Sequence, residues 1–125
     1  EQIYDRQDEV LSTVESPQYN WDAIHEGMKE VINSPLNETN YLNFYDCAVT
    51  VAGKTGTAQK GEGIKNDGLF ICYAPYEDPE IAVAVVVERG HAGASVGFIA
   101  RQIIDVYLNI RSYSNTSESE MSLLK

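Results

Sequence analysis

Residues 68–87 read GLFICYAPYEDPEIAVAVVV, and this stretch decides the fold of the 125-residue chain. It holds two apolar runs, at 68–73 and 81–87, joined by a short segment with two prolines. Both runs are continuously apolar rather than alternating, which predicts strands covered on both faces. Their connection is short enough for an antiparallel hairpin, whereas a parallel crossover needs about a dozen residues or more. The stretch therefore predicts an antiparallel sheet.

The segments on either side of this hairpin predict a third strand and two helices. Residues 49–58 are the strand candidate that precedes the hairpin. Apolar residues recur three or four apart over 21–32, which predicts an amphipathic helix. The same spacing returns over 96–110 and predicts a long closing helix. The candidate N-caps are Asn20 and Ser95, and Pro35 is the expected stop of the first helix.

In this order the elements predict an α+β fold. An N-terminal amphipathic helix and a long C-terminal helix pack on an antiparallel sheet of about three strands. Residues 36–46 are rich in Asn and predict a loop with room for a short helical turn. Residues 112–125 are polar and predict a flexible tail, so the domain portion covers residues 1–111. One amphipathic helix is little cover for the second sheet face, which suggests that part of the domain is missing.

The composition limits the kind of partner and the setting. Nine Lys and Arg against nineteen Asp and Glu give a net charge of −10, which repels nucleic acid and anionic lipid surfaces. Cys47 and Cys72 have neither the number nor the spacing of a disulfide framework or a zinc site, and both read as small core residues. The longest apolar run is far below the ~20 residues of a membrane helix. We expect a soluble segment, and Glu1 in place of Met suggests a longer parent.

The stretch 51–59, VAGKTGTAQ, holds the residues best suited to chemistry. Along a strand, Lys54 and Gly56 share one face while Thr55 and Thr57 share the other. One cation and two hydroxyls make an anion-binding edge, and Gly56 lets a ligand backbone approach closely. The plain alternative is a solvent-exposed strand decorated by polar residues, because a K-T-G tripeptide recurs by chance.

The context of this tripeptide extends far beyond three letters. Residues 53–59, 68–75 and 79–88 resemble the C-terminal part of a class B penicillin-binding protein transpeptidase domain of the penicillin-binding protein 2 type. In that family K-T-G is the third active-site motif. Residues 24–32 resemble the family's helix before this strand, and residues 3–5 resemble the extended segment that enters the helix. The resemblance implies a partial β-lactamase/transpeptidase-like fold.

The resemblance also implies a reaction. In the family a serine on an S-x-x-K motif, assisted by an S-x-N motif, attacks a D-Ala-D-Ala stem peptide or a β-lactam and forms an acyl-enzyme. This chain has no S-x-N, and no serine upstream of the K-T-G strand begins an S-x-x-K. We therefore expect an active D,D-transpeptidase parent and a segment without turnover of its own. No cofactor is implied, and the parent would be anchored in the cytoplasmic membrane outside this segment, with the domain on its outer side.

The roles of individual residues follow from the resemblance along one strand. Lys54 and the backbone N–H of Thr57 would be catalytic: the ammonium joins the serine cluster, and the N–H is one of two oxyanion-hole donors. The hydroxyls of Thr55 and Thr57 would bind the substrate carboxylate. Gly56 would let the acyl group lie flat while the substrate backbone pairs with the strand edge.

Two other interpretations stay open on the sequence. A β-lactamase or a β-lactam sensor domain shares K-T-G, although the long hydrophobic hairpin favours the transpeptidase. A noncatalytic α+β module could capture a peptide carboxylate at the strand edge. We read His25 as a residue of a polar helix face and His91 as a loop residue, and the segment 61–67 as a flexible connection able to gate the site.

The strand over 81–87 predicts a further property. The resemblance implies that it is an inner strand whose outer neighbour comes from a part of the domain that this chain lacks. An apolar edge without charge or proline is a template for another chain. We therefore expect this segment to self-associate through 81–87.

Overall fold

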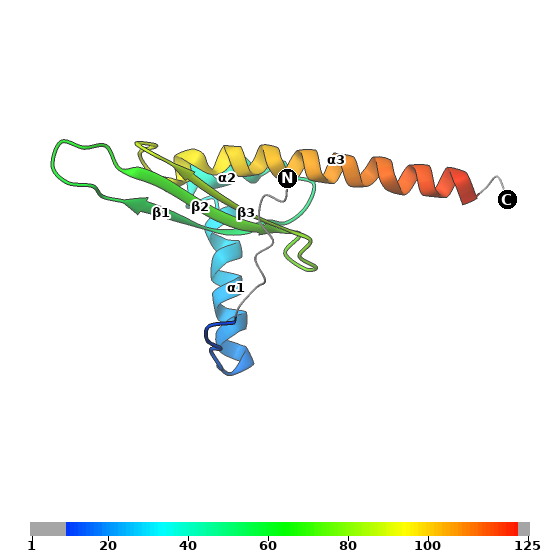
Figure 1. Cartoon of the computed structure of the whole chain (residues 1–125), viewed down its shortest axis with the longest axis horizontal. Coiled ribbons are helices and arrows are strands. Elements are labelled where there is room, and N and C mark those ends of the chain that lie inside the picture. Colours follow the sequence, from blue (N-terminus) through cyan, green and yellow to red (C-terminus); the bar gives the residue numbers. More distant parts are fainter. Residues whose placement is uncertain (1–9, 123–125) are drawn as a thin grey trace, which may run out of the picture.

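The computed structural model describes the backbone of residues 10–122 and the side chains as far as residue 109. The predicted α+β class, with a three-stranded antiparallel sheet and two long helices, is confirmed (Figure 1). Residues 3–5, which resemble an entering segment, lie outside the described residues. The elements are α1 (Gln18–Asn33), α2 (Glu38–Phe44), β1 (Ala52–Ala58), β2 (Asp67–Ala74), β3 (Ile81–Val87), the 3-10 helix η1 (Gly93–Val96) and α3 (Gly97–Ser122).

The sheet has the strand order β1-β2-β3, and both neighbouring pairs are antiparallel. Within the hairpin the register runs without a break from Gly68 opposite Val87 to Ala74 opposite Ile81. The N–H of Glu80 donates to the carbonyl of Ala74 at 2.9 Å and closes the connection. The short linker thus produces the antiparallel pairing that its length predicts.

The two faces of the sheet differ in cover, which corrects one prediction. Phe70 and Val85 are buried, whereas Ile71 and Val86 on the opposite face are 50% and 67% exposed. The long helix α3 runs along one side of the sheet and then past it (Figure 1). The prediction that both faces are covered is therefore wrong for the described residues. An apolar pattern shows that a face is suited to burial, but it does not show which element covers that face.

The buried face joins the sheet to all three helices. The ring of Phe70 stacks on Phe44 of α2 with 5.8 Å between centroids, and Ile104 of α3 and Ile32 of α1 are fully buried in the same cluster. A fully buried side chain of this kind contributes about 1.5 to 3 kcal/mol. Cys72 is buried as predicted, and desolvation raises the pKa of its thiol to about 11.

The start of α1 differs from the prediction. The helix begins at Gln18, directly after Pro17, which is the N-cap residue with a φ of −53° and a ψ of 144°. Asn20 therefore lies inside the first turn and is not an N-cap; its amide donates to Ser16 Oγ at 2.9 Å. The helix ends at Asn33, as the stop at Pro35 predicts.

Three further boundaries were set by context. Part of the expected loop over 36–46 forms the seven-residue helix α2. Ser95 is not a cap, because it lies within η1 and donates its N–H to the Ala92 carbonyl. The helix α3 continues to Ser122, past the expected end at 111, since no glycine or proline follows Gly97 to stop it. Over residues 10–122, no helix combines the length and the apolar character that a bilayer crossing needs.

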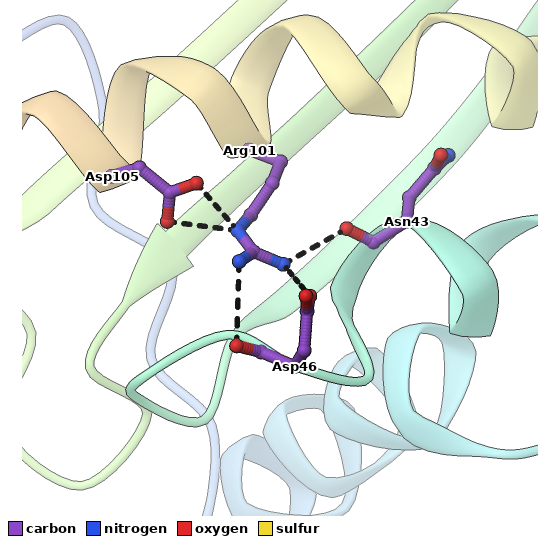
Figure 2. A network of polar contacts seen from close by, with 4 residues as sticks. All are labelled: Asn43, Asp46, Arg101 and Asp105. Atoms are coloured by element: carbon purple, nitrogen blue, oxygen red, sulfur yellow. Dashed lines mark hydrogen bonds and ion pairs between the residues drawn. The ribbon is translucent and has the colours of Figure 1, made fainter.

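Arg101 ties α3 to the chain that leads into β1 (Figure 2). Its Nε donates to the Asp105 carboxylate at 2.8 and 3.0 Å, and Nη1 donates to Asp46 Oδ1 at 2.7 Å and to the Asn43 carbonyl at 3.2 Å. Burial disfavours the charged form, yet the hydrogen bonds with Asp105 and Asp46 outweigh it and raise the pKa of Arg101. A planar guanidinium suits such a fork of acceptors, so the loop before β1 has a fixed position against α3.

The outer edge of β3 leads to a prediction on association. Within residues 10–122, β3 has a strand neighbour on one side only, and Ile81–Val87 carries neither charge nor proline. We propose that two copies pair through β3 across a two-fold axis. Sedimentation over a wide concentration range should show a concentration-dependent dimer.

A charge at the middle of β3 provides the control for this association. Ala84 is exposed at the centre of the strand, so in a two-fold antiparallel pair it faces its own copy. Ala84→Lys places two like charges opposite each other and should return the chain to a monomer. A monomer at every concentration for the unchanged chain would contradict the proposal.

Candidate functional site

The four residues of the predicted site lie together on β1. The strand is regular, with Lys54 opposite Ile71 and Gly56 opposite Leu69, so the side chains alternate between faces as predicted. Within the part of the chain that the structure describes, β1 pairs with β2 on one side only. Among the described residues the K-T-G strand is therefore an edge strand, and its outer side has room for an added strand.

Lys54 is the exposed cation of this edge. Its Nζ donates to the carbonyl of Thr55, its neighbour, at 2.6 Å. The side chain is exposed, so the ammonium can leave this contact at little cost and turn to an anion. The predicted contacts of Lys54 with a serine and S-x-N cluster stay a prediction, because the sequence holds no S-x-N.

Thr57 has a backbone partner that the sequence analysis missed. Its Oγ1 accepts a hydrogen bond from the N–H of Gly93 at 3.3 Å. The approach is close, because a Cβ on Gly93 would lie 2.6 Å from the backbone nitrogen of Gly56 and would also meet the Gly56 and Leu69 carbonyls. Only glycine fits at position 93, so this residue of the glycine-rich turn is packed against the K-T-G strand.

Asp67 joins three segments at the same end of the sheet. Its Oδ1 accepts the N–H of Arg89 at 2.9 Å, and its Oδ2 lies 2.7 Å from Lys60 Nζ. The bond with Lys60 and then that with the Arg89 N–H lower the pKa of Asp67, which keeps the carboxylate charged at neutral pH. The sequence predicts Asp67 within a flexible connection, whereas in the structure it is a buried residue at the start of β2. The sequence signal for this role of Asp67 is a carboxylate directly before an apolar run.

The turn after β3 holds two non-glycine residues in the left-handed region. Arg89 has a φ of 56° and His91 a φ of 67°, values that such residues seldom adopt. The N–H of His91 donates to the Asn66 carbonyl at 3.0 Å. His91 thus contributes through its backbone, in line with the loop role predicted for it.

His25 lies on α1, away from the K-T-G motif. Its ring meets Tyr73 edge to face at a centroid distance of 5.9 Å, beside a pocket of about 450 Å³ that Tyr76 and Glu77 also border. Tyr73 stands opposite Ala52, at the start of β1. The structure therefore places His25 by the far end of β2 from Asp67.

Two other kinds of site can be judged from the chain: a metal site and a serine motif of the S-x-x-K type. No group of three or more His, Cys, Asp or Glu within the described residues is arranged to hold a metal ion. The letters S-x-x-K do occur once in the chain, at 122–125. That match follows the K-T-G strand instead of preceding it, and it begins at the last residue of α3. It therefore does not have the family's motif order.

The sequence has clear relatives. Residues 2–105 match the family model of the penicillin binding protein transpeptidase domain. The chain is 37% identical over 106 residues to the peptidoglycan D,D-transpeptidase MrdA of Haemophilus influenzae, covering 73% of this chain and 16% of that protein. It is 34% identical over 99 residues to MrdA of Escherichia coli, covering 68% of this chain and 16% of that protein. The chain thus spans about a sixth of the length of these relatives.

Solved structures give the same result. PBP2 of Pseudomonas aeruginosa, in complex with WCK 5153, matches with a TM-score of 0.69 and 31% identity, covering 84% of this chain and 23% of that one. PBP2 of Helicobacter pylori, in complex with MreC, matches with a TM-score of 0.66 and 27% identity, covering 74% of this chain and 18% of that one. With its edge K-T-G strand, antiparallel hairpin and closing helix, this chain belongs to the penicillin-binding protein transpeptidase domain family, as a segment of a PBP2-like class B domain.

Proposed function

We propose that this chain is the K-T-G portion of a peptidoglycan D,D-transpeptidase that cross-links cell-wall stem peptides. The observation that carries the proposal is the position of Lys54, Thr55, Gly56 and Thr57 on an open edge strand. The relatives named peptidoglycan D,D-transpeptidase support it. They do not favour a β-lactamase, a β-lactam sensor or a noncatalytic module.

In this proposal the edge strand binds the substrate and the rest of the parent supplies the nucleophile. The substrate backbone pairs with the outer edge of β1, and its terminal carboxylate meets the hydroxyls of Thr55 and Thr57. The charge of Lys54 attracts that carboxylate and joins the serine cluster. The N–H of Thr57 donates to the oxyanion that develops when the serine attacks the carbonyl, and Gly56 leaves room for the acyl group.

The partners of the parent follow from the same chemistry. We propose that it binds D-Ala-D-Ala stem peptides and the β-lactams that mimic them. Penicillin-binding protein A of M. tuberculosis, a structural neighbour with a TM-score of 0.56 and 30% identity, has been solved as an imipenem acyl-enzyme. The parent would be anchored in the cytoplasmic membrane by a segment outside this chain, with the domain on the cell-wall side.

Labelling with a fluorescent penicillin tests the proposal. The complete parent should gain one covalent penicillin, while residues 1–125 alone should gain none, because no S-x-x-K precedes the K-T-G strand. Intact-mass spectrometry reads both results. Ser122→Ala in the isolated chain is the control, since it removes the one downstream match. A parent that is never labelled would contradict the proposed function, and stoichiometric acylation of the isolated chain would contradict the missing nucleophile.

A further inference from the structure

We infer that Asp67 is a positioning residue for substrate recognition: it fixes the turn after β3 so that Gly93 presents the Thr57 hydroxyl as a hydrogen-bond donor to the substrate carboxylate. This inference rests on the proposed function. It assigns a role to two residues, Asp67 and Gly93, that lie outside the K-T-G motif.

The hydroxyl of Thr57 is oriented by its bond with Gly93. A threonine hydroxyl has one proton to donate and two lone pairs that accept. In this structure the Gly93 N–H occupies one lone pair of Thr57 Oγ1. The proton therefore points away from Gly93, and the exposed position of Thr57 leaves it accessible to a ligand. A hydroxyl held as a donor before binding suits a carboxylate, which only accepts.

Gly93 has little freedom to move, because contacts on both sides hold the turn around it. The turn rests directly on the strands: a Cβ on Gly68 would lie 3.2 Å from each of the carbonyls of Gly90 and Ala92. On the far side, Asn43 Nδ2 of α2 donates to the Ala94 carbonyl at 3.3 Å. Gly93 thus lies between two fixed contacts, and its N–H has a defined direction toward β1.

The start of the turn after β3 is held by Asp67 and Asn66. Arg89 and His91 hold left-handed backbone conformations, which persist only where the surroundings determine them. Asp67 Oδ1 holds the Arg89 N–H, and the carbonyl of the preceding residue, Asn66, holds the His91 N–H. Lys60, which follows β1, anchors the same carboxylate from the other side. The carboxylate of Asp67 therefore links the exits of β1 and β3.

The experiment measures acylation of the complete parent by one β-lactam in two forms, the free acid and its carboxyl methyl ester. Asp67→Ala should lower the acylation rate with the free acid about tenfold or more, because displacing a positioning group by ~1 Å is this costly. The rate with the ester should change far less, since the ester is uncharged and offers the Thr57 hydroxyl only a weaker acceptor. In a Thr57→Val background, Asp67→Ala should cause little further loss with the free acid.

Two variants separate positioning from stability. Lys60→Met removes the ion pair but leaves the bond between Asp67 and the Arg89 N–H, so its loss with the free acid should be smaller than that of Asp67→Ala. If Asp67→Ala lowers the yield of folded protein, Asp67→Asn keeps an acceptor oxygen and should show the same selectivity for the free acid in weaker form. Melting temperatures record folding for every variant.

The results separate a failure of the positioning role of Asp67 from a failure of the proposed function. Equal losses with acid and ester, or an undiminished effect of Asp67→Ala in the Thr57→Val background, would show a purely structural role and overturn this inference. The proposed function would survive that result, because the unchanged parent would still be acylated. A parent that neither form of the β-lactam acylates would overturn the proposed function, and this inference with it.

Discussion

Lys54→Ala in the complete parent lowers the rate of acylation by a β-lactam by about 100- to 1000-fold. Lys54 is the cation of the open edge strand, and its ammonium is bound here only by a neighbouring carbonyl, among the contacts the structure describes. Loss of an oxyanion-hole or charged contact in a transition state typically costs about 2.7 to 4 kcal/mol, which corresponds to this factor. Stopped-flow fluorescence with a labelled penicillin measures the rate directly.

Lys65→Ala is the matched control for this substitution. Lys65 is an exposed lysine in the connection that follows β1, beside a pocket bordered by Gly63, Ile64 and Arg89. Removing its charge changes the net charge of the protein by the same amount, so a general electrostatic effect on β-lactam binding would appear in both variants. Equal acylation rates for the unchanged parent and Lys54→Ala would leave the K-T-G strand with a resemblance in fold and no role in acylation.

Gly93→Ala has the second large effect, on both stability and acylation. A methyl group at this position meets the backbone of Gly56 and Leu69, and neither of these two residues can move without disturbing the sheet. Overpacking of this kind typically costs about 1 to 3 kcal/mol, and more where backbone must shift. The displaced turn also loses the bond from the Gly93 N–H to Thr57 Oγ1, so acylation falls with stability.

Gly27→Ala distinguishes this effect from a general cost of replacing glycine. Gly27 lies inside α1, and a Cβ there has no heavy atom within 4 Å. Because alanine favours the helix over glycine, this variant should gain about 0.5 to 1 kcal/mol. Urea unfolding of the complete domain measures both variants. A Gly93→Ala variant as stable as the unchanged domain would show that the turn does not rest on β1.

Local sequence determined the elements of this protein. The two apolar runs and their short linker predict the β2–β3 hairpin, and the apolar spacing predicts the bodies of α1 and α3. Such patterns are readable because the residues of a hairpin or a helix meet neighbours only a few positions away. The alternation of Lys54 and Gly56 against Thr55 and Thr57 was predictable for the same reason, since it depends on strand period alone.

Helix ends and sheet cover were less accessible, because they depend on competing partners. Asn20 and Ser95 have the chemistry of N-caps, but Pro17 starts α1 earlier and the η1 turn takes up Ser95. The apolar runs indicate two faces suited to burial, yet only the arrangement of helices decides which face they cover. Hence Phe70 is buried while Ile71, its neighbour in the chain, is half exposed.

The surroundings of the site were decided by tertiary structure alone. Gly93 and Thr57 are 36 residues apart, and Asp67 and Arg89 are 22 apart, so no periodic pattern connects them. The residue types are readable in advance: a glycine in a turn and a carboxylate before a strand. Their meeting depends on how the chain returns from β3 across the end of the sheet, because a hydrogen bond needs a distance and a direction that only the packed strands supply.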